Sequence, residues 1–171
     1  RFGVDITWID AGQSSDIMDY IKPNTKMIFL ETPSNPLCKV VDIAFMKKAA
    51  EKAGALLVVD NTFATPYHQK PLQQGADLVI HSATKALGGH NDLMAGAIAG
   101  SKERYNDLWF TRQAMGTTLD PQSAFLLDRG LKTFELRAKK MDENARAVAE
   151  FLDGHPEIPR LFYPGLKSHP Q

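Results

Sequence analysis

The run Ala55-Leu56-Leu57-Val58-Val59-Asp60, apolar at five consecutive positions, is the feature that most constrains the fold of this chain. A strand with one face in water alternates apolar and polar residues, whereas an unbroken apolar run is typical of a strand covered on both faces in a parallel sheet. Directly before it, Asp42 is placed to cap a helix over 43–53 and Gly54 is placed to end that helix. The sequence therefore predicts a strand–helix–strand crossover of the kind found in α/β proteins.

Further apolar runs predict more strands, at 4–9, 27–30, 78–81 and 94–100, the last of them as another buried strand. With the crossover, they indicate a doubly wound α/β architecture with a mostly parallel sheet. A helical pattern over 134–152 is expected to leave this first domain. We expect a strand at 158–163 to open a second, smaller domain.

Composition excludes several classes of function. Lys and Arg number 20 against 20 Asp and Glu, so no global positive field favours nucleic acid, and the longest apolar runs are far below the roughly 18 residues of a membrane span. Cys38 is a single cysteine, which suits a reducing compartment, the cytoplasm by default. No His and Cys residues stand at metal-ligand spacing, so no metal is expected and His90 is interpreted as a hydrogen-bonded structural residue.

The carboxyl ends of parallel strands are where α/β sheets bind ligands, and polar residues follow several predicted strands. Asp60 ends one strand, while Ser82, Thr84 and Lys85 follow another. Pyridoxal phosphate needs an amine for its covalent link, an acid beside its ring nitrogen and donors for its phosphate, and these residues supply all three. The spacing of these residues alone leaves a structural alternative open. In that alternative the lysine is only solvated, the aspartate caps the end of a strand and the Ser and Thr belong to an ordinary polar loop.

Two segments resemble the signatures of a known family, Val59-Asp60-Asn61-Thr62-Phe63-Ala64-Thr65-Pro66 and Ser82-Ala83-Thr84-Lys85-Ala86-Leu87-Gly88-Gly89-His90. They are similar to those of the trans-sulfuration enzymes, which depend on pyridoxal phosphate and act in Cys/Met metabolism. Residues 31–36 and 163–170 resemble the same family in the same order. The resemblance implies an aminotransferase-like (fold type I) large domain, with 1–134 as part of the pyridoxal-phosphate domain and 135–171 as an interdomain helix and the start of a C-terminal domain. The chain would then be an internal part of a longer protein.

The resemblance also implies roles for individual residues. Lys85 would form an imine with the cofactor and then shuttle protons, and Asp60 would pair with the pyridine nitrogen. The phosphate would be bound by Ser82 and Thr84. Thr62 would lie against one face of the ring, and Asn35 would sit near the cofactor hydroxyl and the substrate carboxylate. Gly88 and Gly89 are expected to let backbone pass close to the lysine arm.

The function implied is that of a cystathionine γ-synthase or γ-lyase, acting at the γ-carbon of a sulfur amino acid or of O-acylhomoserine. A methionine γ-lyase or a cystathionine β-lyase is the nearest alternative. A different class of alternative is a catalytically silent paralogue that serves as a structural subunit. The family also implies a homo-oligomer, expected to be a tetramer, with a small amino-acid substrate and with neither nucleic acid nor membrane as partner.

Overall fold

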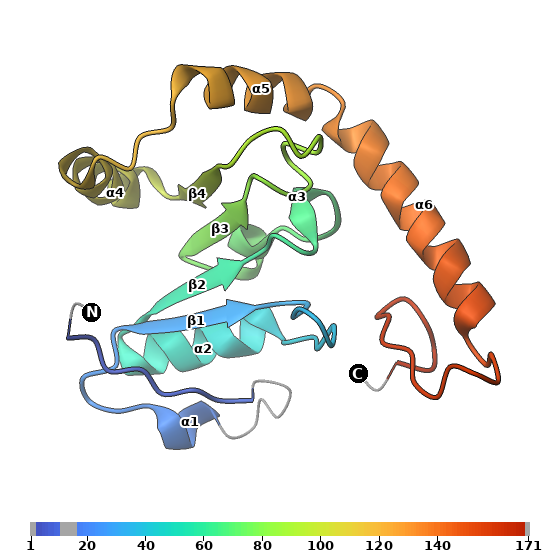
Figure 1. The fold of residues 1–171 in the computed structure, drawn as a ribbon. Helices are drawn as coiled ribbons and strands as arrows, with labels where there is room; N and C mark the ends of the chain where they lie inside the picture. The colour runs from blue at the N-terminus through green and yellow to red at the C-terminus, as the bar shows by residue number, and fades with distance from the viewer. Residues whose placement is uncertain (1–2, 11–16, 170–171) are drawn as a thin grey trace.

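The computed structural model describes residues 3–10 and 17–169, which form a sheet flanked by helices (Figure 1). In chain order the elements are α1 (Ile17–Tyr20), β1 (Met27–Glu31), α2 (Ile43–Ala53), β2 (Leu56–Asp60), α3 (Thr65–His68), the 3-10 helix η2 (Pro71–Gln74), β3 (Leu78–Ser82), β4 (Gly96–Gly100), α4 (Lys102–Met115), α5 (Pro121–Leu131) and α6 (Phe134–Leu152). The sheet is four-stranded, in the order β1-β2-β3-β4.

The first three strands are parallel, and β4 is antiparallel to β3. In the ladder Glu31 lies opposite Asp60, and Asp60 lies opposite Ile80. The carboxyl ends of β1, β2 and β3 therefore meet along one edge of the sheet, and α6 runs past the ends towards which β1 and β2 point (Figure 1). The predicted α/β fold with a mostly parallel sheet is confirmed.

Helix α2 forms as its sequence predicts, between the expected caps. The Asp42 side chain accepts the Phe45 backbone N–H at 2.9 Å, and Gly54 ends the helix in the left-handed region at φ 60°. The helix packs its buried face on one side of the sheet, in a core that consists of Ile17, Ile28, Leu30, Val41, Ile43, Met46, Ala49, Ala50, Leu57, Val59, Ala76 and Val79. This core holds the crossover against β1 and β2, and so sets where those strands end.

The opposite face of the sheet is more open at its edges. Val58, in the middle of β2, is buried on that face. Phe29 of β1 is 56% exposed and Ile98 of β4 is 55% exposed. The described residues thus cover the second face completely only at the centre of the sheet.

Asp77 joins three elements at the amino end of β3. Its carboxylate accepts the Leu57 N–H at 2.9 Å, and it forms ion pairs with Lys47 at 3.1 Å and with Arg104 at 3.2 Å. Burial alone would raise the pKa of Asp77, but the Leu57 hydrogen bond and the two cations outweigh it and lower that pKa below the usual 3.8. This carboxylate ties α2, β2 and α4 together far from the carboxyl edge.

Two predicted strands are absent from the described residues. Residues 4–9 form no ladder, and Trp8 is 87% exposed while Ile9 packs against the core. Residues 158–163 are irregular. Apolar content makes a strand only where a neighbouring edge supplies hydrogen-bond partners, and neither segment has such a partner among the described residues.

The predicted strand 94–100 is shorter than expected, and it is not buried. It forms as β4 at Gly96–Gly100, on the edge of the sheet, and most of its residues are exposed. Its Gly-Ala-Ile-Ala-Gly sequence reads as apolar but has little side chain to pack. The prediction of a buried strand here was wrong because a strand at an edge has a neighbour on one side only.

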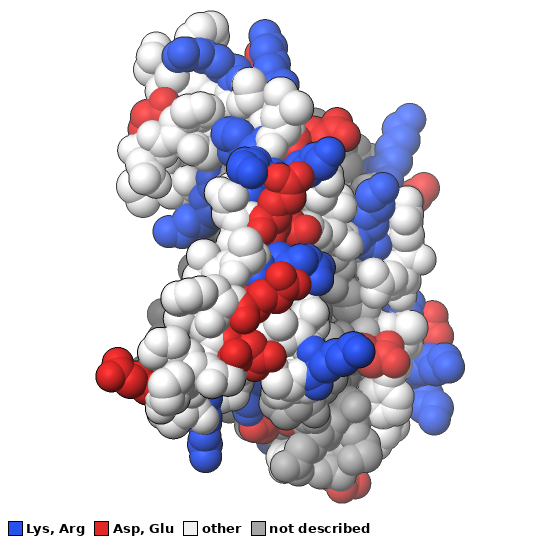
Figure 2. Space-filling model, turned by 90° about the vertical axis from the view of Figure 1, so that its right-hand side faces the viewer, with Lys and Arg blue, Asp and Glu red and all other residues white. Residues whose placement is uncertain are grey.

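The long helix predicted over 134–152 forms with those bounds as α6. Nothing in the structure tests the division of the chain at 134/135, which stays a prediction. No described helix has both the length and the hydropathy needed to span a membrane. On the face drawn in Figure 2, basic and acidic side chains are interspersed rather than gathered by sign.

Candidate active site

Asp60 stands at the carboxyl end of β2, where the chain turns into the segment before α3. One oxygen of its carboxylate accepts the backbone N–H of Thr62 at 2.9 Å. Such a turn holds the side chain of the aspartate against its own backbone. The carboxylate is therefore fixed in direction at the edge of the sheet, while its second oxygen accepts no hydrogen bond from the residues that the structure describes.

Thr62 connects this turn to the next strand. Its hydroxyl oxygen accepts the backbone N–H of Ser82, the last residue of β3, at 2.7 Å. The backbone N–H of Lys85 then donates to the carbonyl of Ser82 at 3.1 Å. Asp60, Thr62, Ser82 and Lys85, predicted from two separate segments of the sequence, thus form one hydrogen-bonded series at the carboxyl edge of the sheet.

Lys85 lies in a tight turn after β3. The Gly88 N–H donates to the Ala83 carbonyl and the Gly89 N–H to the Lys85 carbonyl, both at 2.8 Å. The Lys85 side chain is exposed and lines a pocket of about 390 Å³ between this turn and α6. The turn is held by backbone hydrogen bonds and its lysine side chain is accessible, so a reactant can reach the amine.

The two hydroxyls predicted to bind phosphate differ in their bonding. Thr84 Oγ1 accepts the Ala95 N–H at 2.9 Å and donates to the Ala95 carbonyl at 3.3 Å. The Ser82 hydroxyl forms no hydrogen bond within the described part of the chain. Ser82 is therefore the readier donor, whereas Thr84 would have to turn its proton away from Ala95 to reach a phosphate.

Asn35 stands apart from the other predicted residues. It lies in the loop after β1, at the same edge of the sheet, and its side chain is exposed. No hydrogen bond between described residues links it to Asp60, Thr62 or Lys85. Its predicted position near the cofactor hydroxyl and the substrate carboxylate stays a prediction.

The donor set at this edge fits pyridoxal phosphate. An accessible amine, an oriented carboxylate and a hydroxyl with no partner among the described residues are what the aldehyde, the ring nitrogen and the phosphate of that cofactor require. They are supplied by Lys85, Asp60 and Ser82, which the series of hydrogen bonds places on neighbouring strands. The residues present could hold the cofactor.

The two glycines in the Lys85 turn leave room for different neighbours, a side chain at Gly89 and backbone at Gly88. A Cβ on Gly89 would lie 2.0 Å from a guanidinium nitrogen of Arg137, and Gly89 has a φ of +77°. A Cβ on Gly88 would lie 2.8 Å from the Ala83 carbonyl oxygen. The space beside the turn is thus taken by an arginine of α6 and by the backbone of the turn itself. Arg137 had no signal in the sequence, because only the fold brings α6 beside the turn.

Two other residues discussed in the sequence analysis, His90 and Cys38, are held within the fold by a hydrogen bond and by burial respectively. His90 Nδ1 lies 2.8 Å from the Gly88 carbonyl oxygen, and since a carbonyl only accepts, Nδ1 is the donor. Cys38 is buried, and that burial raises the pKa of its thiol above the usual 9.0. His90 is hydrogen-bonded as predicted, and Cys38 is a poor nucleophile at neutral pH.

His81 lies next to this site on β3. It is buried, and burial lowers its pKa below the usual 6.5, with the nearby Asp60 charge acting in the opposite direction. A neutral imidazole is therefore the favoured form beside the Asp60 carboxylate near neutral pH.

The comparison with family models matches residues 1–171 to the family described as Cys/Met metabolism PLP-dependent enzyme. The cystathionine γ-lyase of Bacillus subtilis (strain 168) is 48% identical over 171 residues, which are 99% of this chain and 45% of that protein. The L-methionine γ-lyase of Fusobacterium nucleatum subsp. polymorphum is 44% identical over 173 residues, with 99% of this chain and 44% of that protein covered.

A solved structure gives the same result at the level of the fold. The crystal structure of cystathionine γ-lyase from Lactobacillus plantarum complexed with L-serine superposes with a TM-score of 0.95 and 39% sequence identity. The match covers 99% of this chain and 45% of that one. The chain thus spans less than half the length of these relatives.

Proposed function

Because the chain belongs to the family of Cys/Met metabolism PLP-dependent enzymes, we propose that the whole protein is a trans-sulfuration enzyme acting at the γ-carbon of a sulfur amino acid or of O-acylhomoserine. Its activity would be that of a cystathionine γ-lyase or γ-synthase. The observation that supports this most directly is the hydrogen-bonded series from Asp60 through Thr62 and Ser82 to Lys85. It brings an aspartate and the backbone of a lysine together at one edge of the sheet.

Lys85 is the proposed nucleophile and proton carrier. Its exposed amine would hold the cofactor covalently at the aldehyde carbon, whose oxygen would leave as water, and the same amine, when released, would serve as a base. Loss of a γ-substituent requires removal of a proton from Cα and then from Cβ. A single lysine on a bonded turn, with a flexible four-carbon arm, can reach both carbons in succession.

Asp60 is proposed to hold the proton of the ring nitrogen. When bound, pyridoxal phosphate supplies a cationic ring that takes up the electron pair left by the Cα proton. The carboxylate of Asp60 is already oriented by the Thr62 N–H. One negative charge fixed in that direction favours the protonated nitrogen.

Ser82 and Thr84 are proposed to orient the phosphate. The Ser82 hydroxyl donates without giving up a partner within the described residues, and Thr84 adds a second donor if its proton leaves the Ala95 carbonyl. Thr62 would then lie at one face of the ring, and Asn35 near the substrate carboxylate. These roles together make the edge of the sheet a site for cofactor and amino acid.

The test is product analysis with the whole protein loaded with pyridoxal phosphate. Cystathionine should be formed from O-acylhomoserine and cysteine by a synthase, or cleaved by a γ-lyase to cysteine, ammonia and 2-oxobutyrate. Cleavage to homocysteine, ammonia and pyruvate would instead identify a β-lyase. The matched control is Lys85→Ala, which should lose whichever activity is found. No turnover of any of these substrates would support the silent paralogue.

A methionine γ-lyase is the second candidate, favoured by the 44% identity to the Fusobacterium enzyme. Such an enzyme converts methionine to methanethiol, ammonia and 2-oxobutyrate. Methanethiol release faster than cystathionine cleavage, measured on the same preparation, would favour it over the leading proposal.

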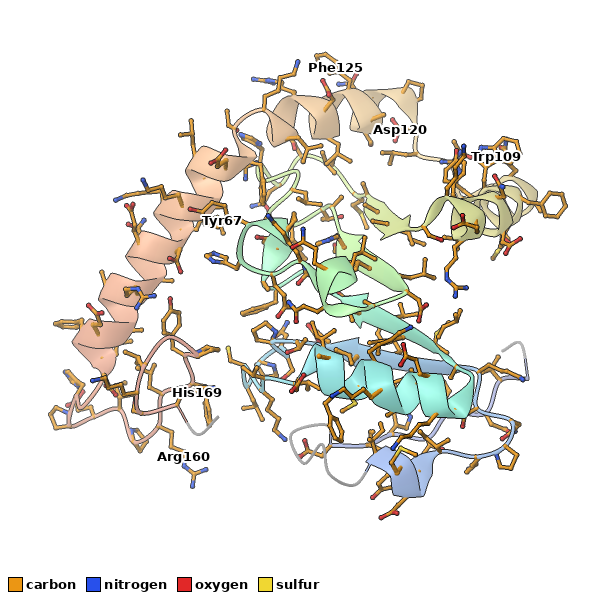
Figure 3. The ribbon with its side chains drawn as sticks, turned by 180° about the vertical axis from the view of Figure 1, so that it is seen from behind. Tyr67, Trp109, Asp120, Phe125, Arg160 and His169 are labelled. Atoms are coloured by element: carbon orange, nitrogen blue, oxygen red, sulfur yellow. The ribbon has the colours of Figure 1, made fainter. Side chains whose placement is uncertain are left out.

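The proposed state of the protein is a homo-oligomer, a tetramer, in the cytoplasm. Apolar side chains on the outer surfaces of the helices support an assembly. Phe125 of α5 is 61% exposed and Trp109 of α4 is 42% exposed (Figure 3). Light scattering on the whole protein would give the number of subunits.

A further inference from the structure

Arg137 reaches from the first turns of α6 into the turn that contains Lys85. One terminal guanidinium nitrogen donates to the Ala86 carbonyl at 2.8 Å, and the other donates to the Leu87 carbonyl at 3.3 Å and the Gly130 carbonyl at 2.8 Å. Its Nε donates to Thr133 Oγ1 at 3.1 Å. One side chain thus bonds both residues that follow Lys85 and ties them to the junction between α5 and α6.

The surrounding backbone is shaped to this contact. Gly89, in the turn, leaves room that a Cβ would take from the guanidinium, at 2.0 Å. Gly130, buried near the end of α5, lies so close to the turn that a Cβ there would be 2.3 Å from the Gly88 carbonyl oxygen. His90 holds that same carbonyl from within the turn at 2.8 Å. The three carbonyls after Lys85 are therefore each held by a side-chain donor.

We propose that Arg137 is a positioning residue for Lys85, which fixes the backbone turn from which the lysine arm extends. The inference rests on the function proposed above for Lys85. Arg137 does not itself need to touch substrate or cofactor. It acts because the Ala86 and Leu87 carbonyls are the next two along the chain, so a shift in either moves the point of attachment of the lysine.

The geometry requires arginine rather than any cation. A planar guanidinium presents several N–H donors in fixed directions, and four hydrogen bonds to four acceptors use that arrangement. A lysine ammonium has three donors on a flexible arm, and its point charge cannot reproduce the fork. Arg137→Lys keeps the positive charge but loses the fixed N–H directions, so it separates the contribution of the charge from that of the directed hydrogen bonds.

The first experiment measures the turn itself, in the whole protein without cofactor. Arg137→Gln should raise the hydrogen exchange rate of the Gly88 and Gly89 amides about tenfold or more, because their turn loses its external bonds. Arg137→Lys should behave like Arg137→Gln. The control is Lys132→Gln, which removes an exposed charge, paired with Asp128, at the same helix junction and should leave these amides unchanged.

The second experiment measures catalysis with cofactor bound. Misplacing a catalytic group by about 1 Å can cost about 10²-fold in rate, so Arg137→Gln should lower kcat by about that factor. KM should change much less, because in the positioning role the Arg137 guanidinium is used on backbone carbonyls rather than on the substrate. A variant that merely weakened the fold would instead lower the melting temperature and the active fraction without changing kcat per active site.

A second variant keeps the proposal testable if Arg137→Gln fails to fold. This variant is Gly130→Ala, whose Cβ would displace the Gly88 carbonyl oxygen. It should therefore raise the hydrogen exchange rate of the amides in the Lys85 turn, although alanine ordinarily stabilises a helix relative to glycine. Unchanged exchange in both variants, or a kcat of Arg137→Gln equal to that of the parent, would overturn the positioning role. Exchange is read without cofactor, so its result stands even where the proposed reaction is not found.

Discussion

The hydroxyl oxygen of Thr62 accepts the backbone N–H of Ser82 at 2.7 Å, across 20 residues of sequence. This bond joins the turn after β2 to the end of β3. The same threonine donates its own N–H to Asp60. Thr62 therefore sets the spacing between the segment with the acid and the segment with the lysine.

Thr62→Val should weaken this edge of the sheet. Valine has nearly the same shape but offers no acceptor, so the Ser82 N–H loses its partner at a cost of about 1–3 kcal/mol. Melting temperature and kcat of the whole enzyme should both fall. Thr62→Ser keeps the oxygen and should retain most of both. Equal behaviour of the valine and serine variants would contradict the linking role.

Lys85→Ala should abolish turnover while the fold persists. General acid–base catalysis contributes about 10²–10⁴-fold, and the covalent link is lost as well. The side chain is exposed, so little packing is removed. The rate and the melting temperature should be measured beside Lys48→Ala, which removes an exposed lysine of α2 that does not line the Lys85 pocket. A near-normal rate in Lys85→Ala would disprove the central assignment.

Asp60→Asn should reduce the rate more than it reduces stability. The amide oxygen can still accept the Thr62 N–H, so the turn is retained, but the charge that favours a protonated ring nitrogen is lost. Steady-state kinetics with saturating cofactor, together with thermal melting, separates the two effects. A kcat equal to that of the parent would show that the carboxylate does not serve the ring.

Asp77→Asn should lower the free energy of unfolding without changing the candidate active site at the carboxyl edge of the sheet. The substitution removes the charge that Lys47 and Arg104 face, at an expected cost of about 1–3 kcal/mol. Because folding lowers the pKa of Asp77, its contribution is complete above pH 3.8, the usual value, and is lost as pH falls through the lower pKa of the folded state. Melting temperature against pH should show the parent and variant converging in acid. Curves that stay parallel down to the lowest pH would contradict this.

The 171-residue chain made alone is expected to be poorly soluble and inactive. Phe29 is 56% exposed, Ile98 is 55% exposed and Phe110 is 71% exposed. Exposed apolar patches promote association. The match to 45% of the Bacillus relative also leaves more than half of that protein's length without a counterpart here. Expression of the chain, followed by gel filtration and an assay with pyridoxal phosphate, is the measurement. A monomeric, active product would refute the expectation.

The local elements of this protein were largely readable from its sequence. The unbroken apolar run of β2, with Asp42 and Gly54 bounding α2, specifies a buried parallel strand and its crossover, because periodicity and caps depend on neighbouring residues only. Asp60 and Lys85 were singled out by their places after predicted strands together with the family resemblance, and their roles stay predictions. Both follow apolar strands, and the edge where parallel strands end is where such residues meet.

Only the tertiary structure decided which segments find partners. Residues 4–9 are as apolar as a strand but pair with no described strand, and β4 lies at an exposed edge, because strand formation and burial require a neighbour that local sequence does not specify. The hydrogen bond between Thr62 and Ser82 joins residues 20 positions apart. Arg137 lies beside Gly89, 48 positions away, and donates to the Ala86 carbonyl, 51 positions away. Contacts of that range depend on how strands and helices pack, so only the fold could reveal what holds the Lys85 turn.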